Sequence, residues 1–219
     1  MEDRIEAQNR LAKALWELGD LAGSKKEYQA TLALDELFAP RGSVHGCMAD
    51  IQGIGVIIQG ESGIGKSEAV LGLLERGYSL VADDITKLRL QDGDEVYGSS
   101  GEVTRNLMEV RGIGIIDVAA TFGVAAIRLE KRVDLVVRLL AWDGIGEVER
   151  LGMEQRFTEL LGRKIPYMEI PVRPGRDLAR LIEVAALHAK VRDAGLNPAE
   201  SLTVRQAAAM KARQAKSQE

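Results

Sequence analysis

The chain has 219 residues, of which 46% are hydrophobic and 28% are charged, and its net charge is -4 at neutral pH. This length suits one catalytic domain with a small extension, rather than several domains. The acidic balance, with a pI near 5.4, argues against a nucleic-acid partner, which would require a basic face. The single cysteine, Cys47, excludes an intramolecular disulfide or a cysteine metal cluster.

The sequence also argues against a membrane protein. Its apolar stretches are interrupted by charge within about ten residues, whereas a transmembrane helix needs about 20 apolar residues in a row. The N-terminal run MEDRIEAQNR lacks the apolar core of a signal peptide. We therefore expect a soluble, cytoplasmic protein.

The character of the chain changes once, near residue 39. Residues 1–38 contain no proline and no β-rich run, and their apolar residues recur at roughly helical spacing, which predicts a helical N-terminal extension. From Ala39-Pro40 onward, short β-branched runs alternate with helical patterns, as is typical of an α/β domain with a central sheet. We place this domain at residues 39–202 and a polar tail, to which we assign no chemistry, at 203–219.

Within the domain, the pattern of apolar and turn residues predicts strands and helices in alternation. The expected elements are a strand at 55–60, a helix at 67–77 that ends at Gly77, a strand over 78–84, a hairpin over 85–98 that turns at Asp92-Gly93, strands at 133–142 and 165–172, and a helix at 176–195. The sequence therefore predicts an α/β fold.

The run GESGIGKS satisfies the pattern G-x-x-x-x-G-K-[ST], with an apolar strand before it and a helix after it. Its glycines allow backbone conformations closed to other residues, so successive N–H groups can turn toward phosphate oxygens at a positive helix end. We expect Lys66 to bridge the β and γ phosphates and Ser67 to place its hydroxyl on Mg²⁺. A chance glycine turn is the alternative. The predicted nucleotide-binding residues are Gly60, Glu61, Ser62, Gly63, Ile64, Gly65, Lys66 and Ser67.

Two adjacent carboxylates, Asp83 and Asp84, end the strand that follows the loop helix. The carboxyl ends of strands line the ligand crevice in open α/β sheets. An aspartate there can accept the proton of an attacking hydroxyl and hold its oxygen in line. Because adjacent strand residues point to opposite faces, we expect one aspartate to face the nucleotide and the other to cap or hold structure. A turn or helix cap is the alternative for the pair.

The stretch EVRGIGIIDV at 109–118 resembles the signature sequence of HPr kinase/phosphorylase. The segments SVHG, GESGIGKS, LVADD and PVRPGR also occur in that family's order, and the similarity runs from about Leu37 to Asn197. The resemblance implies a P-loop core like the nucleotide-binding fold of phosphoenolpyruvate carboxykinase, and assembly as a homo-hexamer. It implies an enzyme that uses ATP or pyrophosphate to phosphorylate a serine of HPr, a small carrier of the sugar phosphotransferase system. It also implies that the enzyme removes this phosphoryl group again by transferring it to inorganic phosphate.

Carried over residue by residue, the resemblance assigns catalytic roles to His45, Lys66, Asp84 and Arg150, with Asp84 as the base or acid, and magnesium binding to Ser67 and Glu109. The signature segment comprises Glu109, Val110, Arg111, Gly112, Ile113, Gly114, Ile115, Ile116, Asp117 and Val118. The segment that the family associates with dephosphorylation comprises Pro171, Val172, Arg173, Pro174, Gly175 and Arg176.

The chemistry of these residues agrees with the implied roles. Glu109 is a hard oxygen ligand of the type that Mg²⁺ prefers, and Arg111 beside it is a candidate partner for phosphate or carboxylate. In PVRPGR, two prolines stiffen a strand-to-helix turn on which Arg173 and Arg176 offer forked donors for phosphate. Arg150 lies in the glycine-containing segment GIGEVERLG, which suits an arginine that approaches the phosphoryl group only when substrate is bound.

Without the family, each residue also has an ordinary structural role. Glu109 and Arg111 alone would form a surface ion pair, His45 would occupy a core or surface position, and Arg150 would be solvated. PVRPGR could be a helix-start turn only. The second histidine, His188, has no motif around it and is expected to be structural.

Three functions stay open at this point. The first is a kinase and phosphorylase that acts on HPr; the second is a kinase of the same fold that acts on another protein or on a small-molecule hydroxyl. The third is a nucleotide-sensing module without turnover. The presence of Asp84, Glu109 and Arg150 together argues against the third, because binding alone needs only the loop and the metal. Family members usually carry a larger N-terminal domain before the segment equivalent to SVHG, and a short segment of different character precedes it here.

Overall fold

The computed structural model describes residues 39–91, 95–142 and 155–196, together with positions 10, 13–17, 19–20, 23, 25–26, 29 and 205. In the N-terminal segment, positions 10, 13–17, 23, 25–26 and 29 are helical, which agrees with the helical character predicted for it. Most of residues 1–38 and 203–219 lie outside the described residues. The division into extension, catalytic domain and tail therefore stays a prediction.

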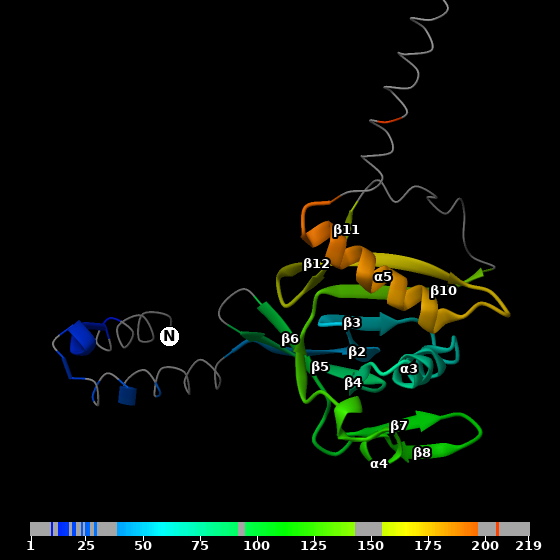
Figure 1. The fold of residues 1–219 in the computed structure, drawn as a ribbon, viewed down its shortest axis with the longest axis horizontal. Coiled ribbons are helices and arrows are strands. Elements are labelled where there is room, and N and C mark those ends of the chain that lie inside the picture. Colours follow the sequence, from blue (N-terminus) through cyan, green and yellow to red (C-terminus); the bar gives the residue numbers. More distant parts are fainter. Residues whose placement is uncertain are drawn as a thin grey trace, which may run out of the picture.

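A six-stranded sheet forms the centre of the molecule (Figure 1). In spatial order its strands are β11 (Arg156–Leu160), β12 (Arg163–Val172), β10 (Leu135–Ala141), β3 (Ile54–Gln59), β2 (Cys47–Ile51) and β4 (Ser79–Ala82). β12, β10 and β3 are parallel neighbours, whereas β2 runs antiparallel to both β3 and β4. It follows that β3, β4, β10 and β12 point the same way and that their carboxyl ends lie at one end of the sheet, which we call the carboxyl end.

Helices α3 (Lys66–Glu75) and α5 (Leu178–Asp193) pack together on one face of this sheet (Figure 1). Helix α3 ends as the sequence predicts: Gly77 adopts a φ of 84° and donates its amide to the carbonyl of Leu74. Alternate side chains of the central strands face these helices and form one apolar cluster with them. Its members include Ala49, Val56, Ile58, Val70, Leu73, Leu135, Val137 and Ile182.

A second, four-stranded antiparallel sheet covers the opposite face. It contains β1 (Arg41–His45), β5 (Ile85–Gln91), β6 (Glu95–Ser99) and β9 (Glu130–Arg132), in the order β1-β5-β6-β9. The other set of alternate central side chains packs against it in a second cluster that includes Met48, Ile57, Val136, Leu88 and Val96. Strands β5 and β6 confirm the predicted hairpin, although its turn at residues 92–94 lies outside the described residues.

The signature segment forms a small hairpin of its own beside α3 (Figure 1). Its strands are β7 (Leu107–Val110) and β8 (Gly114–Asp117), and α4 (Val118–Phe122) and the 3₁₀ turn η1 (Val124–Ala126) follow. Met108 and Val110 are buried, so Glu109 between them faces outward. Asp117 caps α4 by accepting a hydrogen bond from the amide of Ala120.

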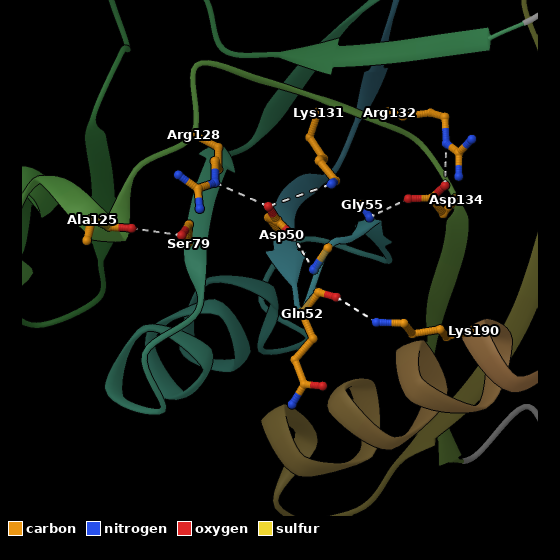
Figure 2. Close-up of polar contacts among 11 residues, drawn as sticks. Asp50, Gln52, Gly55, Ser79, Ala125, Arg128, Lys131, Arg132, Asp134 and Lys190 are labelled. Carbon is orange, nitrogen blue, oxygen red and sulfur yellow. Dashed lines mark hydrogen bonds and ion pairs between the residues drawn. The ribbon is translucent and has the colours of Figure 1, made fainter.

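Ion pairs hold the layers together at the end of the sheet opposite to the carboxyl end, as Figure 2 shows. The mostly buried Asp50 of β2 lies 3.2 Å from Arg128 and 3.8 Å from Lys131, and Asp134 lies 2.7 Å from Arg132. Lys131 belongs to β9 of the small sheet and Asp50 to β2, so their ion pair joins the two sheets. Because the carboxylates of Asp50 and Asp134 are mostly buried, removal of their basic partners would leave a buried negative charge without its ion pair.

No helix among the described residues is both long and apolar enough to cross a bilayer.

Candidate active site

The glycine loop joins the end of β3 to the start of α3, as the sequence predicts. Gly60, Gly63 and Gly65 have φ values of 152°, 83° and 104°, which other residues rarely adopt. Space also requires glycine, because a Cβ at Gly60 would lie 2.9 Å from the carbonyl oxygen of Leu139. The loop therefore presents its backbone amides at the N-terminus of α3, which is a favourable place for phosphate.

Lys66 lies across this loop. Its Nζ donates to the carbonyl oxygens of Gly60 and Glu61, each at 3.0 Å. These bonds keep the ammonium over the loop, where the β and γ phosphates of a nucleotide are expected. Ser67 follows in the first turn of α3, so the predicted lysine and hydroxyl enter the site from the same helix end.

The two aspartates lie beyond β4, which ends at Ala82, and not within it. The prediction that both aspartates lie in the strand and point to opposite faces of the sheet is therefore wrong. Asp84 adopts a φ of 59°, which is uncommon outside glycine, and its carbonyl accepts the amide of Gly46 at 2.8 Å. Here the chain leaves the central sheet for the small sheet in a tight turn, in which the amide of Ile85 donates to the carbonyl of Asp83 at 2.6 Å. A non-glycine residue held in such a conformation is a frequent feature of functional sites.

Asp83 has the structural role that we predicted for one of the pair. Its Oδ1 accepts a hydrogen bond from the thiol of Cys47 at 3.1 Å, and its Oδ2 accepts the backbone amide of Glu109 at 3.0 Å. Cys47 is fully buried. Burial, and next the negative charge of Asp83, raise the pKa of the thiol far above its usual range, so the thiol stays protonated and donates. Asp83 thereby connects β2 to the hairpin that carries the proposed metal ligand.

His45 lies where the sequence predicts, at the end of an edge strand. It is the last residue of β1, and its strand partner is Ile85, the residue directly after Asp84. The next residue, Gly46, bonds the carbonyl of Asp84. The fold therefore brings His45 and Asp84 to the same corner of the site, although they are far apart in sequence.

Arg111 reaches the phosphate loop from the tip of the β7–β8 hairpin. A Cβ built on Gly63 would lie 2.9 Å from Nη1 and 3.1 Å from Nη2 of Arg111, so the guanidinium rests on the loop backbone. Within the described residues, Arg111 and Glu109 form no ion pair with each other. The phosphate-partner alternative therefore suits Arg111 better than the surface ion pair.

The PVRPGR segment forms a turn between β12 and α5. The amide of Arg176 donates to the carbonyl of Arg173 at 3.2 Å, and Gly175 has a φ of 79°. With proline second and glycine third, these features describe a type II turn. Asp177 then caps α5 and accepts from Arg76 at 2.6 Å. The predicted strand-to-helix turn is confirmed, and it lies at the carboxyl end of the sheet.

One residue at this end was not among the predicted site residues. Trp142 follows β10 directly, and the guanidinium carbon of Arg173 lies 3.0 Å from the centroid of its ring. In the sequence, Trp142 is the last residue of the expected strand at 133–142, and Arg173 directly follows the expected strand at 165–172. This pattern predicts a contact between the two residues only when the two strands are known to be parallel neighbours. Arg150 lies outside the described residues, so its approach to the site stays a prediction.

The available donors suit a magnesium nucleotide. Ser67 on α3 and Glu109 on β7, two elements that pack against each other, carry oxygen atoms of the kind that Mg²⁺ prefers. Among the described residues, no group of three or more His, Cys, Asp or Glu side chains could hold a metal ion. A metal here would therefore depend on phosphate oxygens for the rest of its coordination, which is how Mg²⁺ commonly binds with nucleotides.

A phosphate loop between a central strand and a covering helix, with a carboxylate after β4, the next strand along the chain, defines a P-loop nucleotide-binding α/β protein. The family model described as "HPr Serine kinase C-terminal domain" matches residues 36–206. The chain belongs to this family, and the predicted α/β P-loop fold is confirmed.

Similar proteins agree with this family. The chain is 44% identical over 172 residues to the HPr kinase/phosphorylase of Geobacillus kaustophilus, which covers 78% of this chain and 55% of that protein. It is 39% identical over 209 residues to the protein of the same name from Brevibacillus brevis, covering 95% and 67%. It thus spans between 55% and 67% of the lengths of these two curated relatives. The solved structure of the Hpr(Ser) kinase/phosphatase from Coxiella burnetii matches with a TM-score of 0.67 and 33% identity, covering 70% of this chain and 93% of that one.

Proposed function

We propose that the chain phosphorylates a serine of the phosphocarrier HPr, using ATP or pyrophosphate, and removes that phosphate by phosphorolysis. The proposal is supported most by one arrangement: the loop lysine Lys66, the strained Asp84 and the PVRPGR turn all lie at the carboxyl end of one sheet. The choice of HPr as the acceptor is supported by the relatives named HPr kinase/phosphorylase. Assembly as a homo-hexamer is part of the same proposal, and analytical ultracentrifugation tests it.

In the forward direction with ATP, the serine oxygen forms a bond to the γ phosphorus, the bond from that phosphorus to the bridging oxygen of ADP breaks, and ADP leaves. Asp84 accepts the proton of the serine hydroxyl. Lys66 and the loop amides stabilise the charge that develops on the phosphoryl oxygens, and Arg150 adds a second cation when substrate is bound. Ser67 and Glu109 would hold Mg²⁺, which neutralises phosphate charge. His45, whose strand partner Ile85 directly follows Asp84, would help to hold that carboxylate in place.

The reverse direction uses the same groups. An oxygen of inorganic phosphate forms a bond to the phosphorus of phosphoserine, the bond from that phosphorus to the serine oxygen breaks, and the products are pyrophosphate and HPr. The serine oxygen takes up a proton from Asp84, which is now the acid. Arg173 and Arg176, at the two ends of the turn at the carboxyl end of the sheet, would bind the attacking phosphate.

The test is transfer from ATP labelled in its γ-phosphate to purified HPr, followed by release of pyrophosphate when inorganic phosphate is added. Labelled phosphoserine on HPr and its phosphate-dependent loss are the expected results, and HPr with alanine at the acceptor serine is the control. Transfer to another acceptor but not to HPr would favour a kinase of different specificity. Nucleotide binding without any transfer would favour a sensing module.

A further inference from the structure

Trp142 and Arg173 lie side by side because their strands are parallel neighbours in register. The last pair of β10 and β12 is Ala141 with Val172, and Trp142 and Arg173 are the next residue of each chain segment. The guanidinium carbon of Arg173 lies 3.0 Å from the ring centroid of Trp142. Trp142 is 41% exposed, so this pair is at the surface of the carboxyl end.

The stack occupies the face of the guanidinium and leaves its edge available. A cation that lies over an aromatic ring is attracted by the ring face, and the N–H groups of arginine project from the rim of its planar head. Within the described parts of the chain, no carboxylate pairs with Arg173. Arg173 therefore has a fixed position together with donors that remain available for an anion.

The turn that carries Arg173 is anchored on its other side as well. The type II turn places Arg173 and Arg176 at its two ends, which brings their Cα atoms within about 7 Å of each other. Directly after it, Asp177 bonds both the amide of Arg180 and the side chain of Arg76. The indole thus holds the side chain at the start of the turn, and the carboxylate of Asp177 anchors the backbone where the turn enters α5.

We propose that Trp142 is a positioning residue for inorganic phosphate: its indole holds the guanidinium of Arg173 so that Arg173 and Arg176 together receive a phosphate ion. Ordering a long arginine side chain on binding costs free energy, and a side chain that is already stacked avoids part of that cost. ATP also gains binding free energy from the phosphate loop and from contacts with its nucleoside, so the affinity for ATP depends less on Arg173 and Arg176. The assignment to the phosphorolysis direction rests on the proposed function.

The first test compares Trp142→Leu with Trp142→Phe, which keeps an aromatic face. Because a cation–π contact at a partly exposed site contributes about 1–2 kcal/mol, we expect Trp142→Leu to raise the KM for inorganic phosphate by about 5- to 30-fold. The kcat for phosphorolysis and the KM for ATP should change by less than about threefold, and Trp142→Phe should restore most of the phosphate affinity. Equal rises in both KM values, or no benefit from phenylalanine, would overturn the proposal.

The second test does not depend on turnover. The chain contains two tryptophans, so a Trp16→Phe background leaves Trp142 as its one indole emitter. Titration with inorganic phosphate should change its emission, and Arg173→Ala should abolish that response. A phosphate response without phosphorolysis supports the inference and counts against the proposed function. Phosphorolysis with no response and an unchanged phosphate KM in Trp142→Leu overturns the inference and leaves the function standing.

Discussion

Replacing Asp83 with alanine removes the carboxylate that joins the buried thiol of Cys47 to the amide of Glu109. Hydrogen bonds to a charged group contribute about 1.5–3 kcal/mol each. A thiol is a weak donor, and Glu109 is exposed, so both contacts belong at or below the low end of that range. We expect Asp83→Ala to lower the free energy of unfolding by about 2 kcal/mol, which for a protein of this size is a fall in Tm of about 4–8 °C.

The same substitution should weaken metal binding, since it frees the backbone of Glu109. Loss of a group that orients a metal ligand typically costs about 10- to 100-fold in metal affinity. Thermal unfolding by circular dichroism measures the first effect, and the Mg²⁺ dependence of phosphoryl transfer measures the second. Asp83→Asn keeps one acceptor oxygen and should be intermediate, while Asp193→Ala, at the exposed end of α5, is the matched control. A Tm within about 1 °C of the parent protein, with an unchanged Mg²⁺ requirement, would refute this reasoning.

Four further predictions concern single residues. Lys66→Ala should lower transfer in both directions by at least about 100-fold, and initial rates near those of the parent protein would contradict the loop assignment. Asp84→Asn should bind ATP normally by calorimetry but lower transfer by about 10²- to 10⁴-fold, because an amide cannot accept the serine proton. Gly63 has a φ of 83°, and the Cβ of an alanine there would lie 2.9 Å from Nη1 of Arg111. Gly63→Ala should therefore weaken ATP binding by about tenfold, and an unchanged Kd would show that the loop tolerates a side chain. Cys47 should react with iodoacetamide at pH 8 at least about 100-fold more slowly in the native protein than in urea. Burial raises the pKa of its thiol, so the reactive thiolate stays scarce as the pH rises through the ordinary thiol range. Rapid labelling of the native protein would contradict this.

Much of the site could be predicted from the sequence because its parts are local. The phosphate loop, the helix after it and the stop at Gly77 depend on glycine conformations and on spacing within a few residues. The hairpin over β5 and β6 and the turn of PVRPGR follow from short-range turn chemistry in the same way. The position of His45 at a strand edge was predicted from its neighbours, while its role came from the family resemblance alone.

The relations between those parts depend on the tertiary structure. The sequence did not show that β2 runs against β3 and β4, that Asp84 takes a left-handed conformation, or that Asp83 bonds both Cys47 and Glu109, which lie 36 and 26 residues away. The contact of Trp142 with Arg173 likewise requires β10 and β12 to be parallel and in register. Local patterns determine each element because a helix or turn is set by residues close in sequence. Strand order and register come from burial of two faces at once, and only the folded chain brings distant residues within hydrogen-bonding distance.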